Sequence, residues 1–182
     1  TMIREHAAEW HVDPDAIAVI GFSAGGHLAA NLATSTSDDV LVAHGYDPDA
    51  VRPNGLMLAY PVITSGPLAH RGSFDSLLGE RRNDSQALES VSIERHIDAK
   101  TPPVFVWHTV PDETVPYENT LMLIDACKKA GVSVEAHLFP QGGHGLSLGT
   151  AETAWQGVNG IEPSIQIWPQ LAVSWMRRTF AR

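Results

Sequence analysis

Residues 16–30, AIAVIGFSAGGHLAA, change character at a serine that stands between two glycines. Residues 16–20 form an apolar run with the length of a strand, and small and apolar residues at helical spacing follow the second glycine. The sequence therefore predicts a strand, a sharp turn and a helix. Glycines on both sides of the turn are expected to remove side chains that would clash as the strand and the helix close together.

Ser23 stands at the tip of this predicted turn, in the pattern Gly-x-Ser-x-Gly. Such a turn holds the serine in a strained backbone conformation and exposes its hydroxyl, which makes Ser23 a candidate nucleophile. The N–H of Ala24, at the start of the helix, is a candidate donor to a developing oxyanion. The alternative interpretation is a glycine-rich turn that carries a surface serine, because the five-residue pattern also occurs by chance.

Composition and charge limit the function classes. The 182 residues are 43% hydrophobic and 18% charged, as expected for one soluble domain spanning residues 1–182. A formal net charge of −9 disfavours nucleic acid as a partner. No apolar run approaches the length of about 18 residues that a membrane span needs, so no membrane association is expected and a cytoplasmic location is the working expectation.

Neither a metal nor an organic cofactor is expected. The single cysteine, Cys127, excludes an intrachain disulfide and a multi-cysteine zinc site, and its helical spacing from other apolar residues predicts a buried position. The nine histidines are scattered, and no pair has the spacing of a metal site on one helix face.

Apolar runs alternate with helical patterns along the chain. Strands are expected at residues 16–20, 55–60, 104–108 and 132–139, and helices at residues 1–10, after Ser23, at 117–130 and from Pro169. This alternation predicts the α/β class, a three-layer αβα sandwich around a mostly parallel sheet. The last strand alternates Val134, Ala136 and Leu138 against Glu135 and His137, as an edge strand or a one-sided strand would. Residues 62–98 are turn-rich and are expected to form an irregular, cap-like insert at one end of the sheet.

Functional groups of parallel sheets gather in the loops beyond the carboxyl ends of the strands. Ser23 follows the first predicted strand, Asp112 the third and His144 the fourth, in the order serine, acid, histidine. A serine hydroxyl needs a base to accept its proton, and that base needs a carboxylate to orient it. Asp112 is the candidate acid, with Glu113 as its nearest competitor; a solvated turn carboxylate is the alternative interpretation.

His144 is the candidate base because glycines flank it in a loop, which lets its backbone approach the site and leaves little packing reason for an imidazole. His137 lies inside a predicted strand and His108 at a strand end, so structural roles are expected for both. His27 and Val115 are candidate substrate-binding residues.

Four stretches of the chain resemble the α/β-hydrolase superfamily, in its lipase and esterase branch related to acetyl-xylan esterases. They are Gly-Phe-Ser-Ala-Gly-Gly-His-Leu-Ala (residues 21–29), Ala-Tyr-Pro-Val (59–62), Val-Trp-His-Thr to Asp-Glu-Thr-Val-Pro (106–116) and Phe-Pro-Gln-Gly-Gly-His-Gly-Leu (139–146). The resemblance implies Ser23 as nucleophile, Asp112 as acid and His144 as base. It also implies hydrolysis of a short-chain acyl ester through an acyl-enzyme, with an acetyl group on a sugar as one candidate substrate.

The chain departs from this pattern before its elbow. Members of the superfamily carry several strands and a His-Gly-Gly type oxyanion loop there, and neither is present in these residues. The expectation is therefore an α/β-hydrolase fold truncated at its N-terminus, with an exposed sheet edge that favours a homo-oligomer or association with a missing N-terminal segment. A serine peptidase of the same fold, or a catalytically impaired fragment, are the alternatives.

Overall fold

A computed structural model describes residues 1–34, 38–155 and 160–181. Its centre is a sheet of four parallel strands in the order β1-β2-β3-β4. The strands are β1 (Ala18–Phe22), β2 (Gly55–Ala59), β3 (Val104–Thr109) and β4 (Val134–Phe139). All six residues of β3 are buried, as expected for a parallel strand that is covered on both faces.

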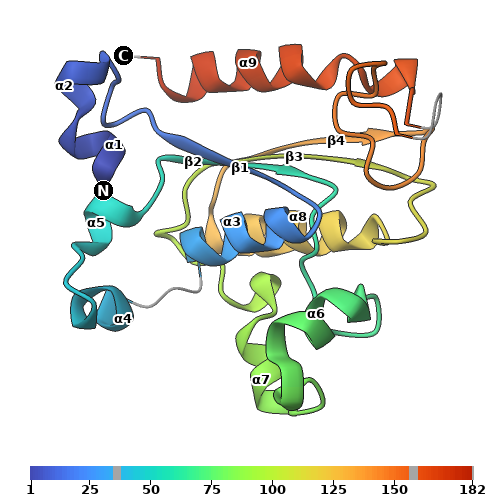
Figure 1. Ribbon diagram of the computed structural model, residues 1–182, viewed down its shortest axis with the longest axis horizontal. Coiled ribbons are helices and arrows are strands. Elements are labelled where there is room, and N and C mark those ends of the chain that lie inside the picture. The colour runs from blue at the N-terminus through green and yellow to red at the C-terminus, as the bar shows by residue number, and fades with distance from the viewer. Residues whose placement is uncertain (35–37, 156–159, 182) are drawn as a thin grey trace.

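Helices cover both faces of the sheet (Figure 1). Helices α3 (Ala24–Thr34) and α8 (Glu118–Ala130) lie on one face, and α9 (Trp168–Thr179) lies on the other. This arrangement confirms the predicted αβα sandwich with a parallel sheet. None of the helices in the described ranges is long and apolar enough to cross a membrane.

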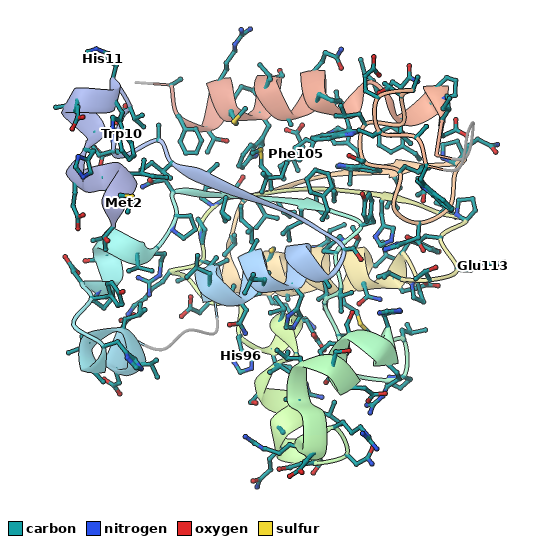
Figure 2. All side chains as sticks on the ribbon, in the orientation of Figure 1. Met2, Trp10, His11, His96, Phe105 and Glu113 are labelled. Carbon is teal, nitrogen blue, oxygen red and sulfur yellow. The ribbon has the colours of Figure 1, made fainter. Side chains whose placement is uncertain are left out.

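Two hydrophobic clusters fill the spaces between the layers. Alternate residues of β3 contribute to each: Val104 and Val106 join the cluster beneath α3 and α8, whereas Phe105 and Trp107 join the cluster beneath α9. Figure 2 shows Phe105 between the sheet and α9. Cys127 is completely buried in the first cluster, as predicted, and burial raises the pKa of its thiol to about 11.

The N-terminal region differs from its prediction. The helix expected at residues 1–10 is two single turns, α1 (Met2–Glu5) and α2 (Ala7–Trp10), because His6 leaves the helical conformation. Strand β1 starts two residues later than expected and continues to Phe22. The main chain of Ile17 is instead bonded to Asn54 in the turn before β2, so strand pairing begins only at Ala18, opposite Gly55.

Strand β4 lies at an edge of the sheet, as predicted, and its more buried face carries the polar residues Glu135 and His137. Ala136 and Leu138 lie on the more exposed face, with Leu138 40% exposed. The ring of His137 packs against Phe105, with the ring centres 5.3 Å apart, and Glu135 binds both His137 and Arg178 of α9. The polar residues therefore point toward α9, where they pair with one another.

The remaining described elements are short helices. They are α4 (Asp38–Ala43), α5 (Pro48–Val51), α6 (Arg71–Leu78), α7 (Ser85–Ser90) and the 3₁₀ turns η1 (Gly79–Arg81), η2 (Ile93–Arg95) and η3 (Pro163–Ile165). Helices α6 and α7 belong to the stretch 62–98 and lie beyond α3 and α8 in Figure 1. At the other edge of the described sheet, β1 pairs with β2 alone, and Ile20 is 43% exposed there.

Candidate active site

Ser23 is the turn between β1 and α3. Its φ angle is 54°, in the left-handed region that residues other than glycine seldom adopt. The backbone around it is bound on both sides: the Ser23 N–H donates to Ala59 O at 2.9 Å, and the Ser23 carbonyl accepts the N–H groups of Gly26 and His27. These bonds hold the turn in its strained conformation and fix the direction of the hydroxyl.

The glycines of the turn have different roles. A Cβ atom on Gly21 would lie 2.2 Å from the carbonyl oxygen of Gly25, and one on Gly26 would lie 2.9 Å from Pro61 Cβ. A Cβ on Gly25 would meet no atom within 4 Å. The expectation that both glycines flanking Ser23 prevent a clash is therefore correct for Gly21 and wrong for Gly25, whereas Gly26 is the second close contact.

The structure brings Ser23, His144 and Asp112 into one hydrogen-bonded chain. Ser23 Oγ lies 2.7 Å from His144 Nε2, and His144 Nδ1 lies 2.6 Å from Asp112 Oδ2. Since the ionised carboxylate only accepts hydrogen bonds, His144 Nδ1 carries a proton and donates a hydrogen bond to Asp112 Oδ2. The Nε2 atom of a neutral ring is then free to accept the proton of the serine hydroxyl.

Asp112 is held at both carboxylate oxygens. Oδ1 accepts the N–H groups of Thr114 and Val115, each at 2.9 Å, while Oδ2 faces His144 and also lies 3.3 Å from His108 Nε2. Burial alone would raise the pKa of this carboxyl. The imidazoles of His108 and His144 and the Val115 N–H more than offset that effect, so the pKa of Asp112 lies well below its usual range and the group stays ionised.

Two competing candidates, Glu113 and His137, lie elsewhere. Glu113 is exposed on the outer side of the same loop (Figure 2). His137 is bound to Glu135 in β4. His144 is thus the imidazole that reaches Ser23, and Asp112 is the acid that binds His144.

Tyr60 is a site residue that the sequence reasoning missed. It follows β2 with a φ angle of 38°, and its ring meets the ring of His144 edge to face, with centres 5.0 Å apart. Its hydroxyl accepts the N–H of Ser147 at 3.0 Å, which ties the loop that carries His144 to the end of β2. Burial raises the pKa of Tyr60, so the phenol is neutral. The signal in the sequence was an aromatic residue at the carboxyl end of a buried strand.

Ala24 is the first residue of α3. The first N–H groups of a helix have no carbonyl partner within it, and the helix dipole makes this end attractive to negative charge. Beside Ala24 lies a cavity of about 380 Å³ between α3 and α6. Its lining residues, most of them apolar, are Ala24, His27, Leu28, Asn31, Ser73, Phe74, Leu77 and Val91.

His27 lines this cavity, whereas Val115 lies in a core cluster. His27 Nε2 donates to Val91 O at 2.7 Å, and its ring packs edge-on against Phe74. Burial lowers the pKa of His27, partly opposed by the bond to Val91 and the charge of Glu94. Val115 is completely buried with Val62 and Phe74, and its N–H binds Asp112.

The groups at this site are a serine, an imidazole, a carboxylate and the amides of a helix N-terminus. They supply a nucleophile, a base with its orienting acid, and a place for an anion. In the described ranges, no group of three or more histidine, cysteine or acidic side chains is arranged to bind a metal ion.

The chain is similar to known proteins. The BD-FAE family model matches residues 1–126. The chain is 34% identical over 157 residues to endo-1,4-beta-xylanase B of Butyrivibrio fibrisolvens, a match that covers 85% of this chain and 25% of that protein. It is 30% identical over 153 residues to an acetylxylan esterase of Xylanibacter ruminicola, covering 82% of this chain and 30% of that protein.

Solved structures share the fold. An acetyl ester-xyloside bifunctional hydrolase from Caldicellulosiruptor lactoaceticus superimposes with a TM-score of 0.79 at 37% identity, over 97% of this chain and 61% of that one. The carboxylesterase Cest-2923 from Lactobacillus plantarum superimposes with a TM-score of 0.78 at 29% identity, over 97% of this chain and 63% of that one.

The parallel sheet and the serine elbow, together with these neighbours, place the chain in the class of proteins with the α/β-hydrolase fold. Within that class, the chain belongs to the BD-FAE family. It spans about a quarter to a third of the length of the two curated relatives and about three fifths of the two solved chains.

Proposed function

We propose that this chain carries the active site of a serine esterase that hydrolyses short-chain carboxylic esters. The observation that carries the proposal is the chain of hydrogen bonds from Ser23 through His144 to Asp112, at 2.7 and 2.6 Å, with the serine on a strained turn at a helix N-terminus. The base is thereby within hydrogen-bond reach of both the nucleophile and the orienting acid.

In the proposed reaction, Ser23 Oγ attacks the acyl carbon while its proton passes to His144 Nε2. Asp112 stabilises the imidazolium that forms, and the Ala24 N–H faces the oxygen on which negative charge develops. His144 then gives the proton to the leaving alcohol, which leaves an acyl-enzyme. Water repeats the same steps: it loses a proton to His144, attacks the acyl carbon, and releases the acid as Ser23 regains its proton.

The proposed substrate class is an acetyl or other small acyl ester. The favoured alcohol part is a carbohydrate, so that the substrate is an acetylated carbohydrate. The names of two relatives, an acetylxylan esterase and an acetyl ester-xyloside bifunctional hydrolase, support this choice. A serine peptidase would use the same groups, so peptide cleavage is the alternative outcome of the test.

Hydrolysis of p-nitrophenyl acetate and of acetylated xylo-oligosaccharides by the wild type and by Ser23→Ala tests the proposal. Loss of the nucleophile is expected to lower kcat by about 1,000-fold or more. Ser76→Ala, at an exposed position of α6, is the matched control and should hydrolyse at the wild-type rate. Equal hydrolysis by wild type and Ser23→Ala, or cleavage of peptides alone, would contradict the proposal. A fluorophosphonate that labels the wild type but not Ser23→Ala would exclude an impaired fragment.

A further inference from the structure

A second imidazole, that of His108, lies against the carboxylate of Asp112. His108 belongs to β3, and none of its side chain is exposed. Its Nε2 atom is 2.9 Å from Val115 O and 3.3 Å from Asp112 Oδ2, and its Nδ1 atom is 2.8 Å from the hydroxyl oxygen of Thr120 in α8. Each ring nitrogen of His108 therefore has a partner in the buried interior.

These partners define the protonation of the ring. The carbonyl of Val115 and the ionised carboxylate of Asp112 only accept hydrogen bonds, so His108 Nε2 carries the proton. The Thr120 hydroxyl can donate to Nδ1, which completes a neutral ring. The Nε2–H donates to Val115 O, and its positive end also faces Asp112 Oδ2, the oxygen that accepts from His144.

We propose that His108 is a positioning residue that holds Oδ2 of Asp112 in the direction of His144 and moderates the negative charge there. The inference rests on the proposed function of Ser23, His144 and Asp112. It gives a second role to a histidine that would otherwise only join β3 to α8.

Two geometric facts support positioning by His108. Among the described residues, the amides bound to Asp112 come from its own loop, Thr114 and Val115, and both bind Oδ1. His108 instead comes from β3, which is paired with β2 on one side and with β4 on the other. His108 therefore links the paired strands to Oδ2. Because the Nε2–H partly neutralises that oxygen, its loss should make the carboxylate a stronger partner for the protonated form of His144.

His108→Leu and His108→Gln test the proposal, because both have nearly the volume of histidine and only glutamine retains N–H donors. In His108→Leu, kcat/KM for p-nitrophenyl acetate should fall about tenfold, mainly through kcat, since a bond to a charged group is lost. The acidic limb of its profile of kcat/KM against pH should move to higher pH by about half a unit. His108→Gln should restore the wild-type limb.

The groups around His144 and Asp112 allow a shift of the acidic limb to be assigned to His108. Among the described residues, the titratable groups in contact with His144 and Asp112 are Ser23, Tyr60 and His108, and α8 contributes the uncharged Thr120. Thr120→Val, which removes the hydroxyl bound to His108, should shift the limb in the same direction but less, and Thr120→Ser should not shift it.

His137→Leu is the matched control, because His137 also lies in a strand beside a carboxylate, Glu135, but outside the site. It should leave the pH profile unchanged. If His108→Leu lowers the thermal midpoint and kcat while the acidic limb stays in place, His108 is only structural and the inference fails.

NMR titration of the His144 ring separates the inference from the proposed function. A shifted His144 titration midpoint in His108→Leu supports the inference even in a protein that hydrolyses no ester. An unshifted midpoint in an enzyme whose activity depends on Ser23 overturns the inference alone. Hydrolysis that is unchanged in Ser23→Ala counts against the proposed function alone.

Discussion

Gly21 lies where the end of β1 passes close to the first turn of α3. A Cβ atom at this position would meet main-chain atoms of Gly25 and Gly26, which cannot rotate away as a side chain can. The stability of the turn at Ser23 therefore depends on the absence of a side chain at Gly21. Gly25, two residues beyond Ser23, has open space around its Cα and no such constraint.

Alanine substitutions at these two positions should have opposite effects. Gly21→Ala is expected to lower the free energy of unfolding by about 3 kcal/mol, since overpacking against backbone forces strand and helix apart. Gly25→Ala should leave it unchanged or raise it by up to about 0.5 kcal/mol, because alanine is the better helix former. Urea unfolding followed by circular dichroism measures both. A Gly25→Ala variant as unstable as Gly21→Ala would contradict the geometry of the turn.

At the scale of the element, α9 is joined to the sheet chiefly by its aromatic face. Trp175 is 3% exposed and contacts Phe105 and Phe180, with ring centres 5.9 and 6.1 Å apart. Gly55, at the start of β2, leaves room for the edge of the Trp175 ring, since a Cβ there would lie 2.9 Å from it.

Truncation of this contact should detach α9 in part. Trp175→Ala is expected to cost about 3 to 5 kcal/mol of the free energy of unfolding, because a large cavity opens between the helix and the sheet. Val173→Ala, in the same helix but 40% exposed, should change it by less than about 0.5 kcal/mol. Thermal unfolding of both variants gives the comparison, and equal losses would refute a packing role specific to Trp175.

The elements differ in how far the sequence determines them. The apolar residues of β3 predict a strand buried on both faces, and parallel strands place Ser23, Asp112 and His144 at one edge of the sheet. Alternation in β4 distinguishes two faces but does not say which one meets α9, because that depends on packing against a helix distant in the sequence.

The contacts of the site are harder to predict than its location. The left-handed backbone of Tyr60 and the approach of His108 to Asp112 depend on how the ends of β2 and β3 are held by the loops that follow them. No local pattern encodes these positions. His108 and Asp112 are four residues apart, but a strand end and a turn separate them, so only the folded loop makes them neighbours.

At the scale of the whole molecule, lowering the pH removes stabilising contributions from several carboxyl groups. The pKa values of Asp38, Asp84, Asp112, Glu135 and Glu152 all lie below their usual ranges. Each depressed carboxyl stabilises the fold above its unfolded pKa of about 4, and that contribution is lost as the pH falls through the lower folded value. Asp84 and Glu152 are exposed and Asp38 is partly exposed, so solvent and salt reduce their share.

His27 extends this acid sensitivity to milder pH. Its pKa is lowered in the fold by burial, so the unfolded chain takes up a proton at about pH 6.5 while the folded chain does not. The free energy of unfolding should therefore fall as the pH decreases from about 6.5 toward the lowered folded value. The net charge of −9 acts in the opposite direction, because acidification toward the isoelectric point of 5.3 relieves repulsion.

A variant isolates the contribution of His27 from that of net charge. His27→Gln retains an N–H donor for Val91 O but takes up no proton, so its free energy of unfolding should fall less between pH 7 and pH 5 than that of the wild type. His44→Gln, at an exposed position, makes the same replacement outside the buried interior and should follow the wild type. Urea midpoints at the two pH values, in dilute protein to avoid precipitation near the isoelectric point, measure the difference. Identical pH dependence in wild type and His27→Gln would mean that the buried imidazole beside the cavity is protonated as readily in the fold as in the unfolded chain.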